Sequence, residues 1–184
     1  MIVNVANMVI FSTMALRSLT SLKLSRSFFS TSRKTVLYYN DVYEVELPAT
    51  HKFPMKKYRL VRETLQQEFG RDPNIEFHVS PLASVEELQL THCPEYVTRF
   101  VNGQLTANEV RKTGFPWSKA SVNRSASSTG GTIAAMRSVL SGKSSNMACH
   151  IAGGTHHAFY NYGEGFCIFS DIAVAANLAL KEYP

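Results

Sequence analysis

Short runs of apolar and β-branched residues alternate along the chain with segments whose apolar positions recur at helical spacing. Residues 35–39 (TVLYY) and 75–79 (IEFHV) have the length and composition of strands. The apolar run at residues 147–152 (MACHIA) is typical of a buried strand, and the pair Gly153-Gly154 ends it in a tight turn. Strands that alternate with helices predict a parallel α/β sheet with connections over its faces.

The helical segments have identifiable ends. Tyr58, Val61, Leu65 and Phe69 recur at helical spacing until Gly70 ends the pattern. Capping boxes, in which a Ser or Thr precedes a Glu by three residues, occur at Ser84/Glu87 and at Thr106/Glu109. Six helices are expected, beginning near residues 58, 84, 94, 106, 121 and 172.

Candidate chemistry is concentrated at residues 152–171, AGGTHHAFYNYGEGFCIFSD. His156 and His157 stand between glycines, and imidazoles are the proton carriers near neutral pH. Adjacent side chains on an extended segment are expected to point to opposite sides, so the two rings need not have the same role. A His-His pair alone is also compatible with surface decoration or with a buried hydrogen-bonding pair. His92, outside this segment, is typical of a satisfied loop histidine.

The flanks of the pair resemble the zinc-dependent histone deacetylase superfamily, in its bacterial and organellar branch. The motifs that carry the resemblance are GGTHHAF at 153–159 and GEGFC at 163–167, with HKFPMKKYRL at 51–60, THCPEYVTRF at 91–100, GFPWS at 114–118 and GGTIAA at 130–135. The resemblance runs from about Thr35 to the C-terminus. It implies a three-layer α/β sheet of the arginase/deacetylase type and hydrolysis of acetyl-lysine or a related small acetylamide.

The resemblance also implies roles for individual residues. His157 corresponds to a general base, and His156 corresponds to its electrostatic and proton-transfer partner. Gly165 and Phe166 match positions that line a narrow acyl-lysine channel. Three further residues are expected near the site, namely Gly154, the thiol of Cys167 and the mainly structural carboxylate of Asp171. The family's Asn before that Asp is Ser170 here.

The zinc ligands that the family implies have no counterpart in the sequence. They are an Asp-x-His pair and a later Asp, accompanied by a Tyr that polarises the substrate carbonyl. The chain has three aspartates, and none stands two residues before a histidine. Catalytic zinc usually has three protein ligands and an open position. We therefore expect a truncated N-terminal portion of a deacetylase domain, inactive alone, with one apolar sheet edge unpaired. The alternative is a catalytically inactive product that acts as an interaction or regulatory module.

The excess positive charge of the chain lies at its N-terminal end. The net charge is +5, but the 150 residues after Lys34 contain 14 basic and 14 acidic residues. Residues 35–184 therefore lack the net positive charge that is typical of a nucleic-acid-binding domain. Cys93, Cys149 and Cys167 lack both the spacing of a zinc site and the even count of a disulfide framework, so free thiols are expected.

Residues 1–34 have the composition of an organelle transit peptide, with no acidic residue and several Ser, Thr, Arg and Lys. Leu16, Leu19, Leu22 and Leu24 lie roughly on one helical side, and RSFFS at 26–30 resembles a mitochondrial processing site. Translation from Met14 stays open. We expect a mitochondrial matrix protein that uses the import machinery, with a plastid as the alternative, and no stable membrane anchor. The deacetylase-like part is expected at residues 35–184.

Overall fold

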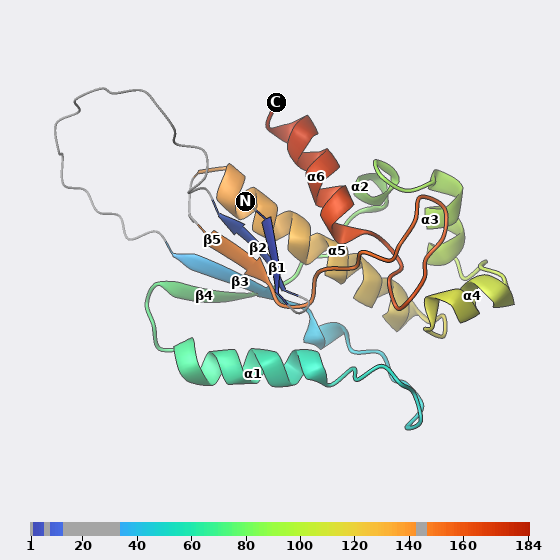
Figure 1. Cartoon of the computed structure of the whole chain (residues 1–184), viewed down its shortest axis with the longest axis horizontal. Helices are drawn as coiled ribbons and strands as arrows, with labels where there is room; N and C mark the ends of the chain where they lie inside the picture. Colours follow the sequence, from blue (N-terminus) through green and yellow to red (C-terminus); the bar gives the residue numbers. More distant parts are fainter. Residues whose placement is uncertain (1, 6–7, 13–33, 143–146) are drawn as a thin grey trace.

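A central β-sheet organises the chain in the computed structural model, which describes residues 2–5, 8–12, 34–142 and 147–184 (Figure 1). Its strand order is β1-β2-β5-β3-β4. β3 pairs in parallel with both β4 and β5, which confirms the expected parallel sheet. The strands are β1 (Ile2–Val5), β2 (Met8–Ser12), β3 (Thr35–Tyr39), β4 (Ile75–Val79) and β5 (Met147–His150).

The edge of β5 was expected to be unpaired, and this expectation is wrong. β2 pairs with it in antiparallel register, from Val9 opposite His150 to Ser12 opposite Met147, and β1 pairs with β2. Both strands come from residues 1–34, whose composition predicts a transit peptide. The sheet is therefore mixed. The leucines of the expected amphipathic helix and the expected processing site lie outside the described residues.

Within the described residues, six α-helices occur where the pattern predicts them. The capping boxes at α2 and α4 are present, and Gly114 ends α4 in a left-handed conformation with φ of 75°. α5 begins before the expected position, because the Ser118 side chain accepts from the backbone N–H of Ser121 and Ser121 caps in return. The helices are α1 (Lys57–Phe69), α2 (Val85–Gln89), α3 (Pro94–Val101), α4 (Ala107–Thr113), α5 (Lys119–Leu140) and α6 (Asp171–Glu182), with a 3-10 turn η2 (Asp41–Tyr43).

The sheet has a helical layer on each side, because side chains alternate along each strand. On one side, Val36 joins the large core formed with α5, α6, α2 and α3. On the other side, Leu37 and Cys149 pack with Leu65 of α1. α5 and α6 thus cover one face and α1 the other (Figure 1). This three-layer arrangement agrees with the predicted fold class.

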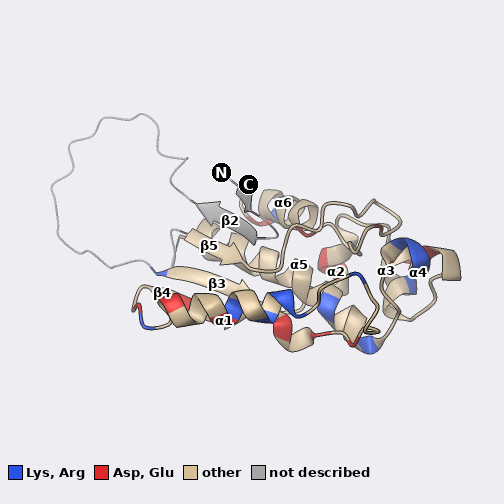
Figure 2. Ribbon diagram, turned by 60° about the horizontal axis from the view of Figure 1, so that its bottom comes forward, with Lys and Arg blue, Asp and Glu red and all other residues tan. Residues whose placement is uncertain are grey.

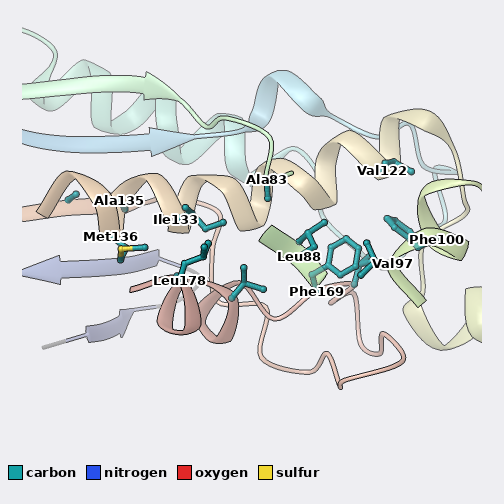
Figure 3. Packing of buried hydrophobic residues seen from close by; sticks show 14 of the residues in the cluster. Ala83, Leu88, Val97, Phe100, Val122, Ile133, Ala135, Met136, Phe169 and Leu178 are labelled. Carbon is teal, nitrogen blue, oxygen red and sulfur yellow. The ribbon is translucent and has the colours of Figure 1, made fainter. Parts of the chain in front are cut away.

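The loop before α6 is tied into the large core through Phe169. Its side chain lies beside Leu88 of α2 and Val97 of α3 (Figure 3). The Phe169 ring also meets Phe100 edge-on, with 5.4 Å between ring centroids. This packing fixes the C-terminal end of the loop that carries the candidate chemistry.

Charged residues of both signs are interspersed on the surface. α1 carries basic residues in its first half and acidic residues after them, and basic residues on α3 and α4 lie near acidic ones (Figure 2). Arg99 of α3 forms a fork of two hydrogen bonds to Glu109 of α4, at 2.7 and 2.9 Å. Arg137 joins α5 to Glu87 and to Glu182. In the described part of the chain, every helix is too short or too polar to cross a lipid bilayer.

Two glycines let α5 approach the ends of the strands closely. A Cβ on Gly130 would lie 2.1 Å from the carbonyl oxygen of Pro81. A Cβ on Gly131 would lie 2.4 Å from both Nε2 of His150 and Oγ of Ser80. Both distances are far below van der Waals contact, so neither position accepts a side chain without a shift of its neighbours.

We predict that Gly131→Ala destabilises the protein by more than ~1 kcal/mol, because the added methyl group meets a rigid buried imidazole. Intrinsic helix propensity alone has the opposite sign and favours Ala by about 1 kcal/mol. Urea unfolding followed by circular dichroism measures the change. Ala134→Gly, at a half-buried position of α5, measures the effect of helix propensity alone. It should lower the free energy of unfolding by about 1 kcal/mol. A gain in stability from Gly131→Ala would contradict the close approach.

Candidate active site

The candidate loop starts where β5 ends and reaches the first residue of α6. Ile151 and Ala152 make a buried turn, and Gly154 follows with φ of 87°. This left-handed conformation suits glycine because a Cβ would strain it. The Oγ of Ser128 on α5 donates to the carbonyl oxygen of Ala152 at 2.9 Å. The start of the loop is therefore fixed to α5.

Asp171 lies behind the loop and is fully buried. Its Oδ2 accepts hydrogen bonds from the N–H of Gly154 at 2.9 Å and from the hydroxyl of Thr132 at 2.5 Å. Its Oδ1 accepts from the N–H and the hydroxyl of Thr155, both at 2.8 Å. The N–H of Asp171 donates back to the Thr155 hydroxyl at 3.1 Å. The carboxylate thus holds the two residues that precede the histidine pair.

His156 and His157 lie in a turn rather than on an extended segment, so the expectation that they point to opposite sides is wrong. Their ring centroids are 4.1 Å apart, with an interplanar angle of 44°. Nδ1 of His156 lies 3.0 Å from the carbonyl oxygen of Gly154, which can only accept, so Nδ1 carries a proton and donates it to this oxygen. Both rings are exposed among the described residues. The structure therefore brings two imidazoles together on one side of the loop.

Gly165 and Phe166 form a tight turn held by the end of α4. Their N–H groups donate to the carbonyl oxygens of Lys112 at 3.1 Å and of Thr113 at 2.9 Å. Both residues have positive φ, 56° and 67°, and Phe166 is the one non-glycine with positive φ in the described ranges. A side chain in this conformation costs on the order of 1–3 kcal/mol. A Cβ on Gly165 would lie 3.4 Å from the ring of His157, so the turn abuts the histidine pair.

A cavity of about 40 Å³ lies beside this turn. Phe53, Phe115 and Phe166 contribute rings to its wall, with centroids 4.9 to 5.3 Å apart. Arg124 of α5 also lines it, with its guanidinium 4.2 Å above the ring of Tyr58. The Nη1 atom of Arg124 is buried and has no hydrogen-bond partner among the described residues. Sequence reasoning missed Arg124, whose only signal is a charge within a helix of small residues.

The thiols near the site are buried and free. Burial raises the pKa of the Cys167 thiol above its ordinary value, and it raises that of Cys149 to about 11. Both groups are therefore neutral thiols at physiological pH and poor nucleophiles. Cys93 is only partly buried.

His92 fastens the outer part of the loop. Its Nδ1 lies 2.9 Å from the carbonyl oxygen of Phe159, and its Nε2 accepts from the N–H of Ser170 at 2.9 Å. The prediction of a satisfied histidine is confirmed. Trp117, by contrast, is anchored away from the loop by a 2.7 Å hydrogen bond to the carbonyl oxygen of Phe100.

The residues that the structure describes do not fit a zinc ion. In these ranges no three His, Cys, Asp or Glu side chains are placed to hold a metal. Asp171, the one aspartate at the site, has both carboxylate oxygens occupied by hydrogen bonds from the loop and α5.

The model of the histone deacetylase domain matches residues 51–184, which include the loop, its clamp and the cavity. The chain belongs to the histone deacetylase family. An uncharacterized protein of Picosynechococcus sp. is 40% identical over 140 residues, which are 76% of the chain and 45% of that protein. The acetoin utilization protein AcuC of Staphylococcus aureus is 32% identical over 162 residues, 83% of the chain and 41% of that protein.

Solved structures give the same family. The structure of an HDAC homolog from Aquifex aeolicus matches with a TM-score of 0.65 and 25% identity. The match covers 82% of this chain and 42% of that protein. This histone deacetylase family chain thus spans less than half the length of the relatives that it matches.

His150, the last residue of β5, lies in the core next to the loop of the site. It is fully buried, and its Nδ1 lies 3.0 Å from the Thr132 hydroxyl. Burial lowers the pKa of His150 to about 4, Arg124 acts in the same direction, and Asp171 opposes both. The imidazole is therefore neutral at physiological pH.

We predict that acid destabilises the protein through His150. The pKa is about 4 in the folded state and about 6.5 in the unfolded state, so the unfolded chain binds more protons between these values. The contribution is intact above pH 6.5 and is lost as the pH falls towards 4, by on the order of 2–3 kcal/mol. Urea unfolding at pH 7.5, 6, 5 and 4.5 measures it. His150→Asn should flatten this slope, and an equal slope in both proteins would contradict the assignment.

Proposed function

We propose that this chain carries the proton-transfer part of a zinc-dependent deacetylase site that hydrolyses acetyl-lysine or a related small acetylamide. The observation that carries the proposal is the GGTHH loop, in which two exposed imidazoles lie 4.1 Å apart on a backbone clamped by Asp171. Amide hydrolysis needs a base to take a proton from water and an acid to give a proton to the leaving amine. Paired imidazoles supply both functions near neutral pH.

The two rings divide the work because of their closeness. Their ring centroids are 4.1 Å apart, so both imidazoles can reach the same water molecule and the same leaving amine. We assign the general base to His157 and the electrostatic and proton-transfer role to His156. The hydrogen bond from Nδ1 of His156 to Gly154 supports this, because it orients the ring and leaves Nε2 to exchange a proton.

The substrate side is assigned to Gly165, Phe166 and the cavity behind them. The flat wall of Phe166 suits the aliphatic stem of an acyl-lysine. The cavity of about 40 Å³ favours a small acyl group, and Nη1 of Arg124 is a donor for its oxygen. Cys167 and Asp171 bind no substrate in this proposal, since both are buried behind the turn.

Zinc supplies the Lewis acid of the reaction in this family. We place its ligands, and the group that polarises the carbonyl, outside the described residues. The share of 41–45% that the chain covers in the relatives supports this placement. The mitochondrial matrix, with a plastid as alternative, and the use of the import machinery stay predictions, because the described ranges omit residues 13–33.

The first test of this proposal is the native protein itself. Intact mass and peptide mapping of the endogenous product establish its length, and bound zinc is measured in the same sample. We expect peptides that continue past Pro184 with an Asp-x-His pair, together with zinc-dependent release of acetate from an acetyl-lysine peptide. A native product that ends at Pro184, binds no zinc and releases no acetate would favour an interaction module instead.

We predict that His157→Ala lowers kcat/KM of the active native form by about 10²- to 10⁴-fold, the usual contribution of a general base. Acetate release from an acetyl-lysine peptide and from a small acetylamide measures the effect. His78→Ala is the matched control, because His78 is half-exposed on β4 and pairs with Glu76 away from the loop. Equal losses in the two variants would contradict the assignment.

A further inference from the structure

A layer of buried polar side chains lies between the parallel strands and α5. Asn40 and Ser80 directly follow β3 and β4, and His150 ends β5. All three are at most 1% exposed, and each has one side-chain atom without a hydrogen-bond partner, namely Asn40 Oδ1, Ser80 Oγ and His150 Nε2. Buried polar groups are costly unless they are paired, so their position at the strand ends beside the candidate site calls for an explanation.

The hydrogen bonds of Thr132 fix the direction of the contact with His150. The Thr132 hydroxyl has one proton, which it donates to Oδ2 of Asp171 at 2.5 Å. The same oxygen must therefore accept from His150, whose Nδ1 lies 3.0 Å away and carries the proton. His150 is thus the donor at the end of a directed chain, from Nδ1–H to Thr132 and from Thr132 to Asp171.

The other side of the ring is equally defined. In this tautomer Nε2 has a lone pair, and a Cβ built on Gly131 would lie 2.4 Å from both Nε2 and the Oγ of Ser80. The missing side chain of Gly131 leaves room for the ring at this point. The charged groups that influence the pKa of His150 are Asp171 of α6, which raises it, and Arg124 of α5, which lowers it. Burial next to Arg124 keeps the ring neutral, which keeps Nδ1–H as its single donor.

We propose that His150 is a positioning residue that acts through Thr132 on Asp171, and so holds the backbone of Gly154 and Thr155 that presents the histidine pair. Donation from His150 polarises the Thr132 hydroxyl and strengthens its bond to the carboxylate, because hydrogen bonds in a chain reinforce one another. Asp171 then keeps one orientation, with Oδ2 on Gly154 and Oδ1 on Thr155. The catalytic consequence rests on the proposed function, whereas the structural link does not.

The alternative is that His150 only fills space, and two substitutions separate the roles. His150→Leu keeps similar volume and removes the donor. His150→Asn loses volume and keeps an N–H donor directed at Thr132. A packing role predicts that Leu is tolerated better than Asn, and a positioning role predicts the reverse order.

The experiment measures amide hydrogen exchange by NMR on the 184-residue chain at pH 7. The N–H groups of Gly154 and Thr155 report the clamp, since both donate to Asp171. The N–H of Ile151, which donates to Tyr38 in the sheet at 2.9 Å, reports global opening. We expect His150→Leu to raise exchange at residues 154 and 155 at least tenfold relative to Ile151, and His150→Asn to restore it to within threefold of the parent. His78→Leu, at a half-exposed histidine, should leave all three rates unchanged.

A second pair of variants covers the case in which His150→Leu does not fold. Thr132→Val is nearly isosteric and breaks the chain at its middle, whereas Thr132→Ser keeps the hydroxyl. Faster exchange at residues 154 and 155 in the Val variant, with the parent rate in the Ser variant, supports the proposal. Unchanged exchange in the Val variant, or equal exchange in the Leu and Asn variants of His150, overturns it.

Activity then separates this inference from the proposed function. In a native form that releases acetate, His150→Leu should lower kcat at least tenfold with KM within twofold, and His150→Asn should recover most of the loss. If the exchange result holds and no form of the protein releases acetate, the positioning role stands and the deacetylase proposal fails. If acetate is released and exchange at residues 154 and 155 does not respond, the positioning role fails alone.

Discussion

The buried carboxylate of Asp171 is the constraint on which the candidate site depends. A carboxylate without solvent must have its lone pairs met by donors, and four N–H and O–H groups from the loop and α5 meet them here. Asp171 is also the first residue of α6, and its carboxylate accepts a hydrogen bond from Thr132 of α5. The loop is therefore fixed relative to both helices. The positions of His156 and His157 are thus set from behind, by groups that take no part in chemistry themselves.

The unusual composition of α5 follows from this constraint. A helix that lies against polar strand ends needs hydroxyl groups where donors and acceptors are required and no side chain where the backbones approach. Thr132 and Ser128 provide the hydroxyls towards Asp171 and the loop, and Gly130 and Gly131 provide the close approach. Such a helix has low intrinsic propensity, so its stability depends on burial and on the capping box at Ser118.

Local patterns in the sequence were enough to predict most of the fold. Strand runs, helical spacing and capping boxes depend on neighbours within a few residues, and the structure confirms them. Pairing between β2 and β5 joins residues more than 130 positions apart, and nothing local indicates it. The histidine pair was predicted, but its geometry was not, because a turn replaced the expected extended segment. Arg124 and His150 were missed since the burial of a polar side chain depends on partners that only the tertiary fold assembles.

The two sides of the loop that carries the proposed chemistry differ in how well they are enclosed by protein. Behind the imidazoles, the loop is held by hydrogen bonds to the fully buried carboxylate of Asp171, and electrostatic interactions are strong in a protein interior. In front of them, both rings are exposed among the described residues. A general base next to bulk water gains little from such preorganisation, because water competes for its lone pair and screens the developing charge. The proposed hydrolysis at this loop therefore depends on a second wall that excludes water from the two rings.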